Sequence, residues 1–364
     1  MSGSIAGAGV TGYGLLGRLI ADSANQRQRL DTLTAQASSG KVADTYAGLG
    51  SGAAVSLNLR PAIANIVVWQ GNIDTATGRL GATQAAMTQI QSIVADFRAQ
   101  LNNLNGLSGA MNVDTIAAKA RSALAQVGNL LDTQVGGIYV FAGQDTANPP
   151  VPNPDTITSS GFYTQIAAAV GGLAVSGATA AAVATQAIGA SNAAGTSPFS
   201  AYLSQPAANL SAPIVQVGMT DTRAAGLFAS ANTGVTSTGG STTGSYMRDT
   251  LRALATIGAL SGSQAGTAGF TDLVRDTQTS LTGAGEAMAG DAGVMGDVQA
   301  SLTSHRSLLA DMNTVLTGQL SSAEDADMAA TLSNLAQAQT RLQASYQLIA
   351  AANGLSLAKF LPAG

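Results

Sequence analysis

Among the residues that could do chemistry, the single histidine of this 364-residue chain comes first. His305 lies at helical spacing from Leu302 and Leu309, and there is no second histidine to join it as a metal ligand or general base. We therefore predict a histidine on the surface or in the packing of a helix. The chain also has no cysteine, which excludes disulfides and thiolate metal sites.

A second candidate is an acidic group near the C-terminus. Glu324, Asp325 and Asp327 are close enough in sequence to act as paired carboxylates in hydrolysis. The run Ser322–Asp325 also fits a capping box, in which a hydroxyl and a carboxylate accept hydrogen bonds from free N–H groups at the start of a helix. Helix capping is the role that we predict.

The other candidates lack the partners that their chemistry needs. The serine-rich stretch 237–245 has no Gly-x-Ser-x-Gly elbow and no nearby histidine base. Gly7-Ala8-Gly9 lacks a preceding strand and a P-loop lysine, and Trp69 is expected to be a packing residue. The sequence thus predicts no enzyme and no catalytic, cofactor-binding or metal-binding residue.

Charge and hydropathy exclude further classes. Only 10% of residues are charged and the net charge is −4, which gives no electrostatic case for nucleic acid. Residues 156–220 carry no charge, but 166–190 is too weakly apolar to drive membrane insertion, so we expect a neutral surface domain. The first 20 residues lack the cationic start and cleavage site of a classical secretory signal.

Apolar residues at helical spacing occupy both ends of the chain. The first predicted helix carries its stripe on Leu16, Leu19, Leu30 and Leu33 and stops at Ser38-Ser39-Gly40. Further helices are predicted at about 55–104 with an interruption near Pro61, and at 113–135, 246–260, 271–288, 294–320 and from 322 onward.

The last predicted helix has a heptad pattern. Its first heptad position is occupied by Met328, Leu335, Leu342 and Ile349, its second by Leu332, Gln339, Tyr346 and Asn353, and Leu357 and Phe360 close the stripe. About 38 residues would give a helix of about 57 Å. So few charges lie on it that most of its faces are expected to contact protein. Heptads leave two partners open: the N-terminal helix of the same chain, or neighbouring subunits.

The middle of the chain has a different pattern. Residues 137–143 predict a short strand between glycines, and the proline-rich segment 148–154 predicts a break. The following insert combines an alanine-rich helical stretch with strand candidates at 214–217 and 224–230, and 234–244 has the composition of a flexible return linker. The predicted domains are 1–40 with 322–364, 41–150 with 245–321, and the insert 151–244.

The two ends resemble a known family. Residues 29–41, which end in Ser-Ser-Gly-Lys, resemble the N-terminal segment of the flagellin superfamily. Residues 324–329, 342–346 and 355–361 resemble its C-terminal helix. The resemblance covers roughly the first 105 and last 95 residues. It implies a mainly α fold, with a long antiparallel coiled-coil or helical-bundle core formed by both termini and a small mixed or β-containing outer domain inserted in the middle.

Within the superfamily, residues 137–146 with Pro149-Pro150 resemble the branch that joins the flagellar hook to the filament, the third hook-associated proteins. Bulk flagellins usually show Phe-Asn-Gly here, and this chain has none. Val215–Gly218 also suits the small outer domain of the junction branch. The extension Pro362-Ala363-Gly364 and the unusually neutral insert depart from the pattern and leave the outer-domain fold open.

The resemblance implies a structural subunit of the bacterial flagellum, exported by a type III apparatus without a cleaved signal and located outside the cell. Implied partners are other copies in a ring, the preceding hook-associated protein, flagellin and a possible export chaperone, with no nucleic acid and no membrane insertion. The alternatives are a bulk flagellin or a secreted adhesin or enzyme domain displayed on helical ends. The expected assembly interface comprises Leu16, Leu19, Leu30, Leu33, Met328, Leu332, Leu335, Leu342, Tyr346, Ile349, Leu357 and Phe360.

Overall fold

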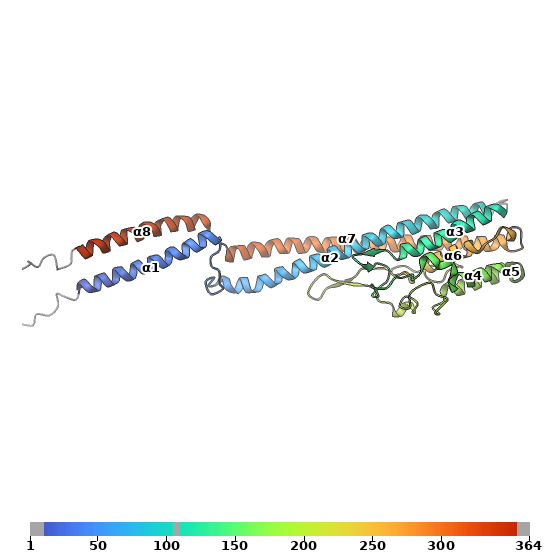
Figure 1. Cartoon of the computed structure of the whole chain (residues 1–364), viewed down its shortest axis with the longest axis horizontal. Helices are drawn as coiled ribbons and strands as arrows, with labels where there is room; N and C mark the ends of the chain where they lie inside the picture. The colour runs from blue at the N-terminus through green and yellow to red at the C-terminus, as the bar shows by residue number, and fades with distance from the viewer. Residues whose placement is uncertain (1–10, 105–109, 355–364) are drawn as a thin grey trace, which may run out of the picture. The chain divides into compact units, whose positions relative to one another are not determined.

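The computed structural model describes residues 11–104 and 110–354, with side chains for 17–104 and 110–351. Helices dominate these residues, as the sequence predicts (Figure 1). The chain forms two compact units, one of residues 1–67 with 311–364 and the other of residues 68–310. Two long helices, α2 (Gly52–Leu104) and α7 (Phe270–Glu324), contribute to both units. We call the first the terminal unit and the second the central unit.

In the terminal unit, α1 (Thr11–Ser39) packs along α8 (Met328–Gly354) (Figure 1). The two helices are antiparallel, since Lys41 at the end of α1 pairs with Asp325 before α8, and Arg27 contacts Tyr346 further along. Helix α1 stops where predicted. Gly40 adopts a φ of 69°, which favours glycine, and its N–H donates to Gln36 O at 2.9 Å.

In the central unit, α2 and α7 also run antiparallel. Gln278 donates to Asn102 at one end, and Arg306 donates to Asp74 at the other. Helix α3 (Ala110–Leu131) and helix α6 (Tyr246–Ala259) pack together, and α6 also contacts the helices of the insert. Every residue of α6 except the last is buried, so this helix lies at the centre of the core.

Two predicted helix breaks are wrong. Pro61 lies inside α2, where it removes one backbone donor on an exposed face without ending the helix. Residues 289–293 continue α7, although this stretch contains two glycines. Gly290 has a packing reason to be there: a Cβ at this position would lie 2.8 Å from Val235 Cγ1. Close approach by the segment around Val235 therefore requires a glycine in the helix.

The middle of the central unit contains two small hairpins. Strands β1 (Gln134–Val135) and β2 (Ile138–Tyr139) flank Gly136 and Gly137, whose φ values of 62° and 78° match the two-residue turn that favours glycine. The predicted strand at 137–143 is thus shorter, and Ala142 then pairs with Phe228 in an isolated bridge. The second hairpin pairs β3 (Ile214–Gln216) with β4 (Thr222–Ala224).

The candidate at 214–217 is therefore confirmed, whereas the one at 224–230 is wrong because the turn after β3 is short and brings the return strand earlier. The remaining elements are α4 (Gly161–Gly171), α5 (Leu173–Ala190) and the 3₁₀ helices η1 (Pro154–Ser159), η2 (Ala207–Asn209) and η3 (Gly262–Gln264).

The predicted flexible linker at 234–244 is instead packed against the core. Asp291 of α7 accepts hydrogen bonds from the N–H groups of Thr233 and Gly234, and Ser241 donates to Asp276. Arg252 of α6 donates to the carbonyl oxygen of Ser241. Composition predicted flexibility, but buried polar side chains of α6 and α7 bond the segment in place.

Helix α5 is the one helix among the described residues that is long and apolar enough to meet the length and composition test for a membrane span. It is broken at Gly177, where φ is 77° and ψ is 166°, so its 18 residues do not form one regular helix. An 18-residue regular helix is close to the minimum that a span requires.

Candidate functional site

The terminal unit contains the surface that the sequence singles out. The residues of α1 that face α8 are spaced alternately by four and three: Leu19, Ser23, Gln26, Leu30, Leu33 and Ala37. The matching residues of α8 are Thr331, Leu335, Ala338, Leu342, Ser345 and Ile349. This alternation is the heptad pattern of a coiled coil. We call these twelve residues the α1–α8 seam.

Half of the seam consists of small or polar residues. Small residues such as Ala338 and Ser345 let helices approach closely but bury little apolar surface. Gln26 has a side-chain oxygen that is shielded from water and has no hydrogen-bond partner among the described residues. An unpaired buried amide group opposes folding. The seam therefore holds the two helices together weakly.

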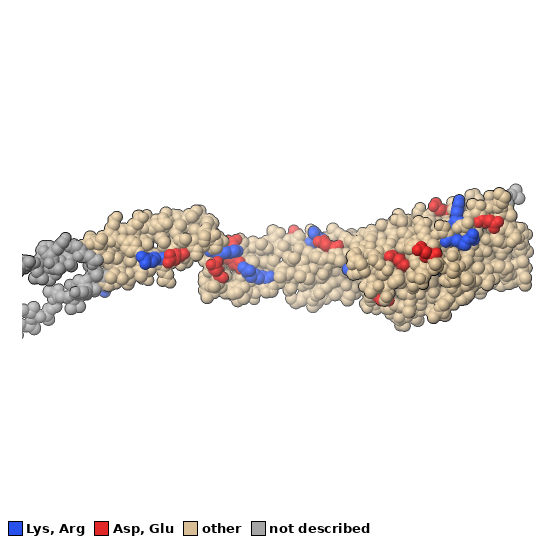
Figure 2. All heavy atoms as spheres, in the orientation of Figure 1, with Lys and Arg blue, Asp and Glu red and all other residues tan. Residues whose placement is uncertain are grey.

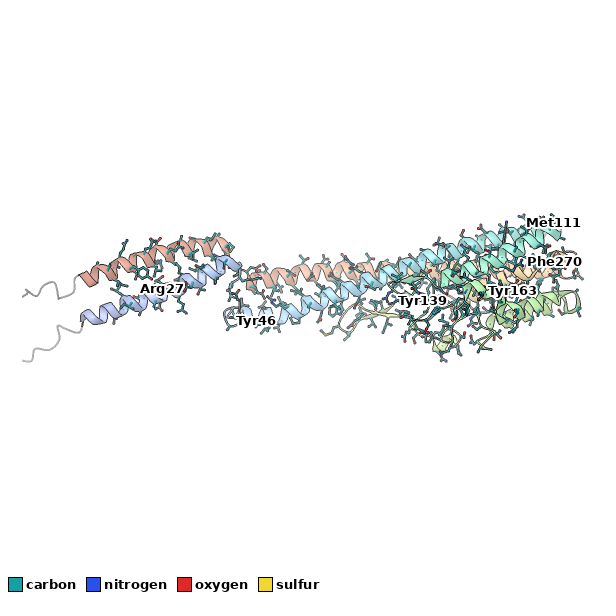
Figure 3. All side chains as sticks on the ribbon, in the orientation of Figure 1. Arg27, Tyr46, Met111, Tyr139, Tyr163 and Phe270 are labelled. Atoms are coloured by element: carbon teal, nitrogen blue, oxygen red, sulfur yellow. The ribbon has the colours of Figure 1, made fainter. Side chains whose placement is uncertain are left out.

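Four other large apolar residues of α8 lie outside the seam. Leu332 is 52% exposed and Leu348 is 59% exposed, and Met328 and Tyr346 are also exposed. On α1, Ile20 is exposed in the same way. Tyr346 is covered in part by Arg27, which projects from α1 toward α8, donates to the tyrosine hydroxyl and lies 5.9 Å from its ring centroid (Figure 3).

Charges are unevenly divided between the two helices. Helix α8 carries a single charged residue, Arg341, whereas α1 carries five. On the face drawn in Figure 2, charged side chains occur in small mixed groups, and most of the surface of α1 and α8 carries none. Exposed apolar residues on a weakly paired pair of helices are typical of a protein–protein contact surface.

A second feature of the terminal unit is an ion-pair cluster where α1 ends and α8 begins. Glu324 is 4% exposed and its carboxylate accepts hydrogen bonds from Ser56 at 2.5 Å and from Arg60 at 2.7 and 2.6 Å. Lys41 lies 3.5 Å from Glu324 and 2.9 Å from Asp325. We call Lys41, Ser56, Arg60, Glu324 and Asp325 the Glu324 cluster.

Backbone bonds join the same segments. Val42 N–H donates to Glu324 O at 2.7 Å, and Ala326 N–H donates to Gly40 O at 2.9 Å. Gly52, at the start of α2, would place a Cβ 2.9 Å from Ala323 O, so only glycine fits there without movement. The cluster thus ties the turn after α1 and the first turns of α2 to the break between α7 and α8.

The electrostatics of the cluster favour the charged carboxylate. Hydrogen bonds from Arg60 and then Ser56 lower the pKa of Glu324 from 4.5 to about 2, with a smaller contribution from Lys41. Lys41 likewise lowers the pKa of Asp325, and the pKa of Lys41 itself is raised, chiefly by its hydrogen bond to Asp325. An open pocket of about 510 Å³ beside the cluster is lined by Tyr46 and Leu49 in addition to the charged groups.

The predicted capping box at Ser322–Asp325 is wrong. These residues lie at the C-terminal end of α7, and their carboxylates bind Arg60 and Lys41 instead of free backbone N–H groups. Helix α8 begins later and is capped by Asp327, whose Oδ1 accepts from the N–H groups of Ala329 and Ala330 at 3.0 and 3.1 Å. One member of the acidic group is a cap, and the other two form ion pairs.

The remaining candidate residues have structural surroundings. His305 lies on α7 with its Nε2 3.5 Å from Asp221 Oδ2. Ser237 and Ser241 are buried in the packed segment before α6. No group of three or more His, Asp or Glu side chains in the described parts of the chain is arranged to hold a metal ion.

Comparison with protein families identifies both ends of the chain. The N-terminal helical region of bacterial flagellin matches residues 20–146, and the C-terminal helical region matches residues 279–361. The chain belongs to the flagellin superfamily. The two matches include α2, α3 and α8 in full and most of α1 and α7. No individual curated protein matches the chain significantly.

The family indicates the role of the chain. Flagellins are structural, non-enzymatic proteins that are exported to the outside of the cell and assemble into the polymers of the bacterial flagellum. The two matches cover the helical regions at the two ends of this chain. This flagellin-superfamily chain is therefore a structural component of the flagellum that associates with copies or relatives of itself.

The predicted assembly residues fall into three sets. Leu19, Leu30, Leu33, Leu335, Leu342 and Ile349 lie in the α1–α8 seam of one chain. Met328, Leu332 and Tyr346 are exposed. The side chain of Leu16, together with Leu357 and Phe360, lies outside the described residues. The first heptad position is thus confirmed as facing α1 at 335, 342 and 349, but the second lies at 331, 338 and 345, one residue before the predicted one.

Sequence reasoning missed the Glu324 cluster and the small residues of the seam. In the sequence Lys41 is simply the end of the Ser-Ser-Gly-Lys motif, and Arg60 has no acidic residue near it. In a chain with 10% charged residues, a single arginine in an apolar stretch was a usable signal. The seam was missed because large residues at 332 and 346 fit a heptad equally well by spacing, and only the partner helix decides between the two registers.

Proposed function

We propose that this chain is the subunit that joins the flagellar hook to the filament, with one side of its ring facing the preceding hook-associated protein and the other facing flagellin. Two sequence features support the junction role over the filament role: the Gly-x-Tyr-x-Phe-Ala-Gly stretch at 137–143, and the absence of Phe-Asn-Gly. The observation that carries the assembly mechanism is the exposure of Leu332 and Leu348 beside a seam that is half small or polar.

The physics of the terminal unit supports assembly through this surface. Two helices that share a narrow seam gain little from burial, while ordering their backbone costs about 1–2 kcal/mol per residue. Neighbouring subunits that cover the exposed leucines supply the missing burial. Folding of α1 and α8 is then coupled to assembly, and a subunit in transit through a type III export channel has loosely held ends.

A deletion strain tests the junction role. Cells that lack the gene are expected to carry hooks without filaments and to release flagellin into the medium. Electron microscopy of the cells and immunoblotting of the medium measure the two effects. Normal filaments on the deletion strain contradict the proposal, and restoration of filaments by the wild-type gene is the control.

Surface variants test the mechanism separately. Leu332→Ala and Leu348→Ala remove exposed apolar side chains, and Val183→Ala removes one that is 60% exposed in the central unit. The two leucine variants are expected to fold normally but fail to restore filaments, whereas the valine variant restores them. Full restoration by both leucine variants would show that assembly uses another surface.

A bulk filament subunit is the second candidate, because the matching families are the helical regions of flagellin itself. Seeded growth distinguishes the two roles. Purified chain added to filament fragments is expected to add at most a short layer if it is a junction protein. Growth of long filaments from the seeds, followed by light scattering and electron microscopy, would establish the filament role instead.

A further inference from the structure

A polar pocket of about 380 Å³ lies in the central unit. It is bounded by the end of α5, the segment around Gln205, residues 230–236 and the start of α6. The side chains that matter for its chemistry are Asn192, Gln205, Ser230, Asn232, Thr236 and Arg248.

Arg248 places a buried positive charge at this pocket. It is 6% exposed, and its guanidinium lies 5.2 Å from the ring centroid of Phe199. Nε donates to Ser230 O at 2.9 Å, Nη1 donates to two backbone carbonyls at 3.1 Å, and Nη2 donates to Asn192 Oδ1 at 2.6 Å. These bonds use four of the five N–H groups of the guanidinium.

No carboxylate balances this charge within the described residues. All four acceptors are neutral, and none of the ion pairs found among residues 17–104 and 110–351 includes Arg248. The nearby Arg252, by contrast, has Asp276 at 3.7 Å. Burial lowers the pKa of Arg248, because the guanidinium has lost water without gaining a counter-charge.

A second group at the pocket also lacks a partner. Ser230 is 4% exposed, and its hydroxyl oxygen is shielded from water with no hydrogen-bond partner among the described residues. A buried hydroxyl without a partner is costly, so such groups usually bind something. The Ser230 hydroxyl is itself closed to the pocket, so the uncompensated charge of Arg248 is the feature that makes the pocket complementary to an anion.

The rim of the pocket indicates the rest of the ligand. Gln205 and Thr236 are exposed and uncharged, and they add amide and hydroxyl groups beyond Arg248. The volume exceeds what a lone carboxylate needs and is within the range of small-molecule sites. A ligand rich in hydroxyl groups can form hydrogen bonds with these amide and hydroxyl groups.

We propose that this pocket binds an acidic monosaccharide of the uronic-acid type, with its carboxylate at Arg248 and its ring hydroxyls at Gln205 and Thr236. The bonds of Arg248 to backbone carbonyls hold the guanidinium in position, and the sugar carboxylate supplies the missing negative charge. The site is independent of the proposed junction role, because it uses no residue of the terminal unit.

Titration of the full-length chain tests the proposal, with binding followed by isothermal calorimetry and NMR. Glucuronate is the ligand probe, glucose tests the hydroxyls without the charge, and acetate tests the charge without the hydroxyls. Glucuronate is expected to bind with a Kd on the order of 1 mM, at least tenfold more tightly than either control. Absence of glucuronate binding, or equal binding of glucose or acetate, would overturn the proposal.

Variants then assign the site. Thr236→Ala and Gln205→Ala are each expected to weaken glucuronate binding by about three- to tenfold, which is the contribution of one hydrogen bond. Asn209→Ala is the matched control, since Asn209 is an exposed amide in the same segment but does not line the pocket. Gln205 is exposed, so its variant folds normally. Equal binding by Gln205→Ala, Asn209→Ala and the wild type would place the sugar elsewhere and refute the assignment.

Discussion

The terminal and central units of this chain place their apolar residues in opposite ways. Among the described residues, the buried apolar side chains lie in the central unit with three exceptions, Leu33, Ile66 and Ala338. More than half of the large exposed apolar side chains lie in the terminal unit, although it provides less than a third of the described residues. The central unit has a core of its own, whereas the exposed side chains of the terminal unit are those that the proposed assembly would cover.

Polar groups do not divide the two units in this way. In the central unit, buried Tyr246, Arg252 and Asp291 bond to backbone or to each other and fix the segment that precedes α6. Arg252 Nε and the Ser230 hydroxyl of the same unit nevertheless have no partner among the described residues. The side-chain oxygen of Gln26 in the α1–α8 seam also lacks one. An unsatisfied group weakens the contact that contains it, and the narrow seam has little buried apolar surface to offset that cost.

The largest expected effect is a cavity in the central core. Leu254 of α6 is fully buried, so Leu254→Ala should lower the free energy of unfolding by about 2–5 kcal/mol. Leu332→Ala, the same change at an exposed position of α8, should alter it by less than about 0.5 kcal/mol. Chemical denaturation followed by the fluorescence of Trp69 measures both. Equal losses would mean that the two units share one core.

The contrast between the units also shows what the sequence alone could predict. Local signals predicted two elements correctly. A stripe of apolar residues predicts α6, and a glycine after the last turn predicts the end of α1. Local signals failed for the continuity of α7, because tertiary packing at Gly290 overrides the weak helix propensity of glycine. They failed for the packed segment 234–244 for the same reason, since distant aspartates bond it in place.

Within the candidate site, the heptad alone could not fix which side of α8 faces inward. Leu335, Leu342 and Ile349 were identified, but Thr331 and Ser345 look like surface residues until α1 is placed beside them. The ion pairs of Glu324 join positions more than 250 residues apart, so no local pattern predicted them. Charge near a helix boundary is consistent with capping as well as with pairing.

The second expected effect concerns pH and the Glu324 cluster. The folded-state pKa of Glu324, about 2, is below its ordinary value of 4.5. The cluster therefore stabilises the terminal unit fully above about pH 4.5, and this stabilisation is lost as the pH falls toward 2. Hydrogen exchange at the amides of Val42 and Ala326, corrected for intrinsic rates, should show protection that decreases over this range.

Glu324→Gln is the matching variant for that experiment. It keeps the shape of the side chain but removes its charge, so protection of the same two amides should be low at neutral pH and nearly independent of pH. Asp272→Asn is the control, since Asp272 is exposed in the central unit and its ion pair is with its helix neighbour Arg275. A variant that retains the pH dependence of the wild type would assign it to another carboxylate.

The smallest expected effect comes from a variant that strengthens the α1–α8 seam of the terminal unit. Gln26→Leu replaces the unpaired buried amide with an apolar side chain between Leu30 and Leu19, so pairing of α1 with α8 should strengthen by about 1 kcal/mol. Hydrogen exchange across residues 19–37 measures the change, and Gln28→Leu, at an exposed position, is the control. Because the proposed assembly couples folding of these helices to contact with neighbours, the seam variant should also lower the subunit concentration needed for assembly. An unchanged seam would mean that Gln26 is already satisfied by water, and that exposure of Leu332 and Leu348 alone accounts for the dependence of this unit on neighbours.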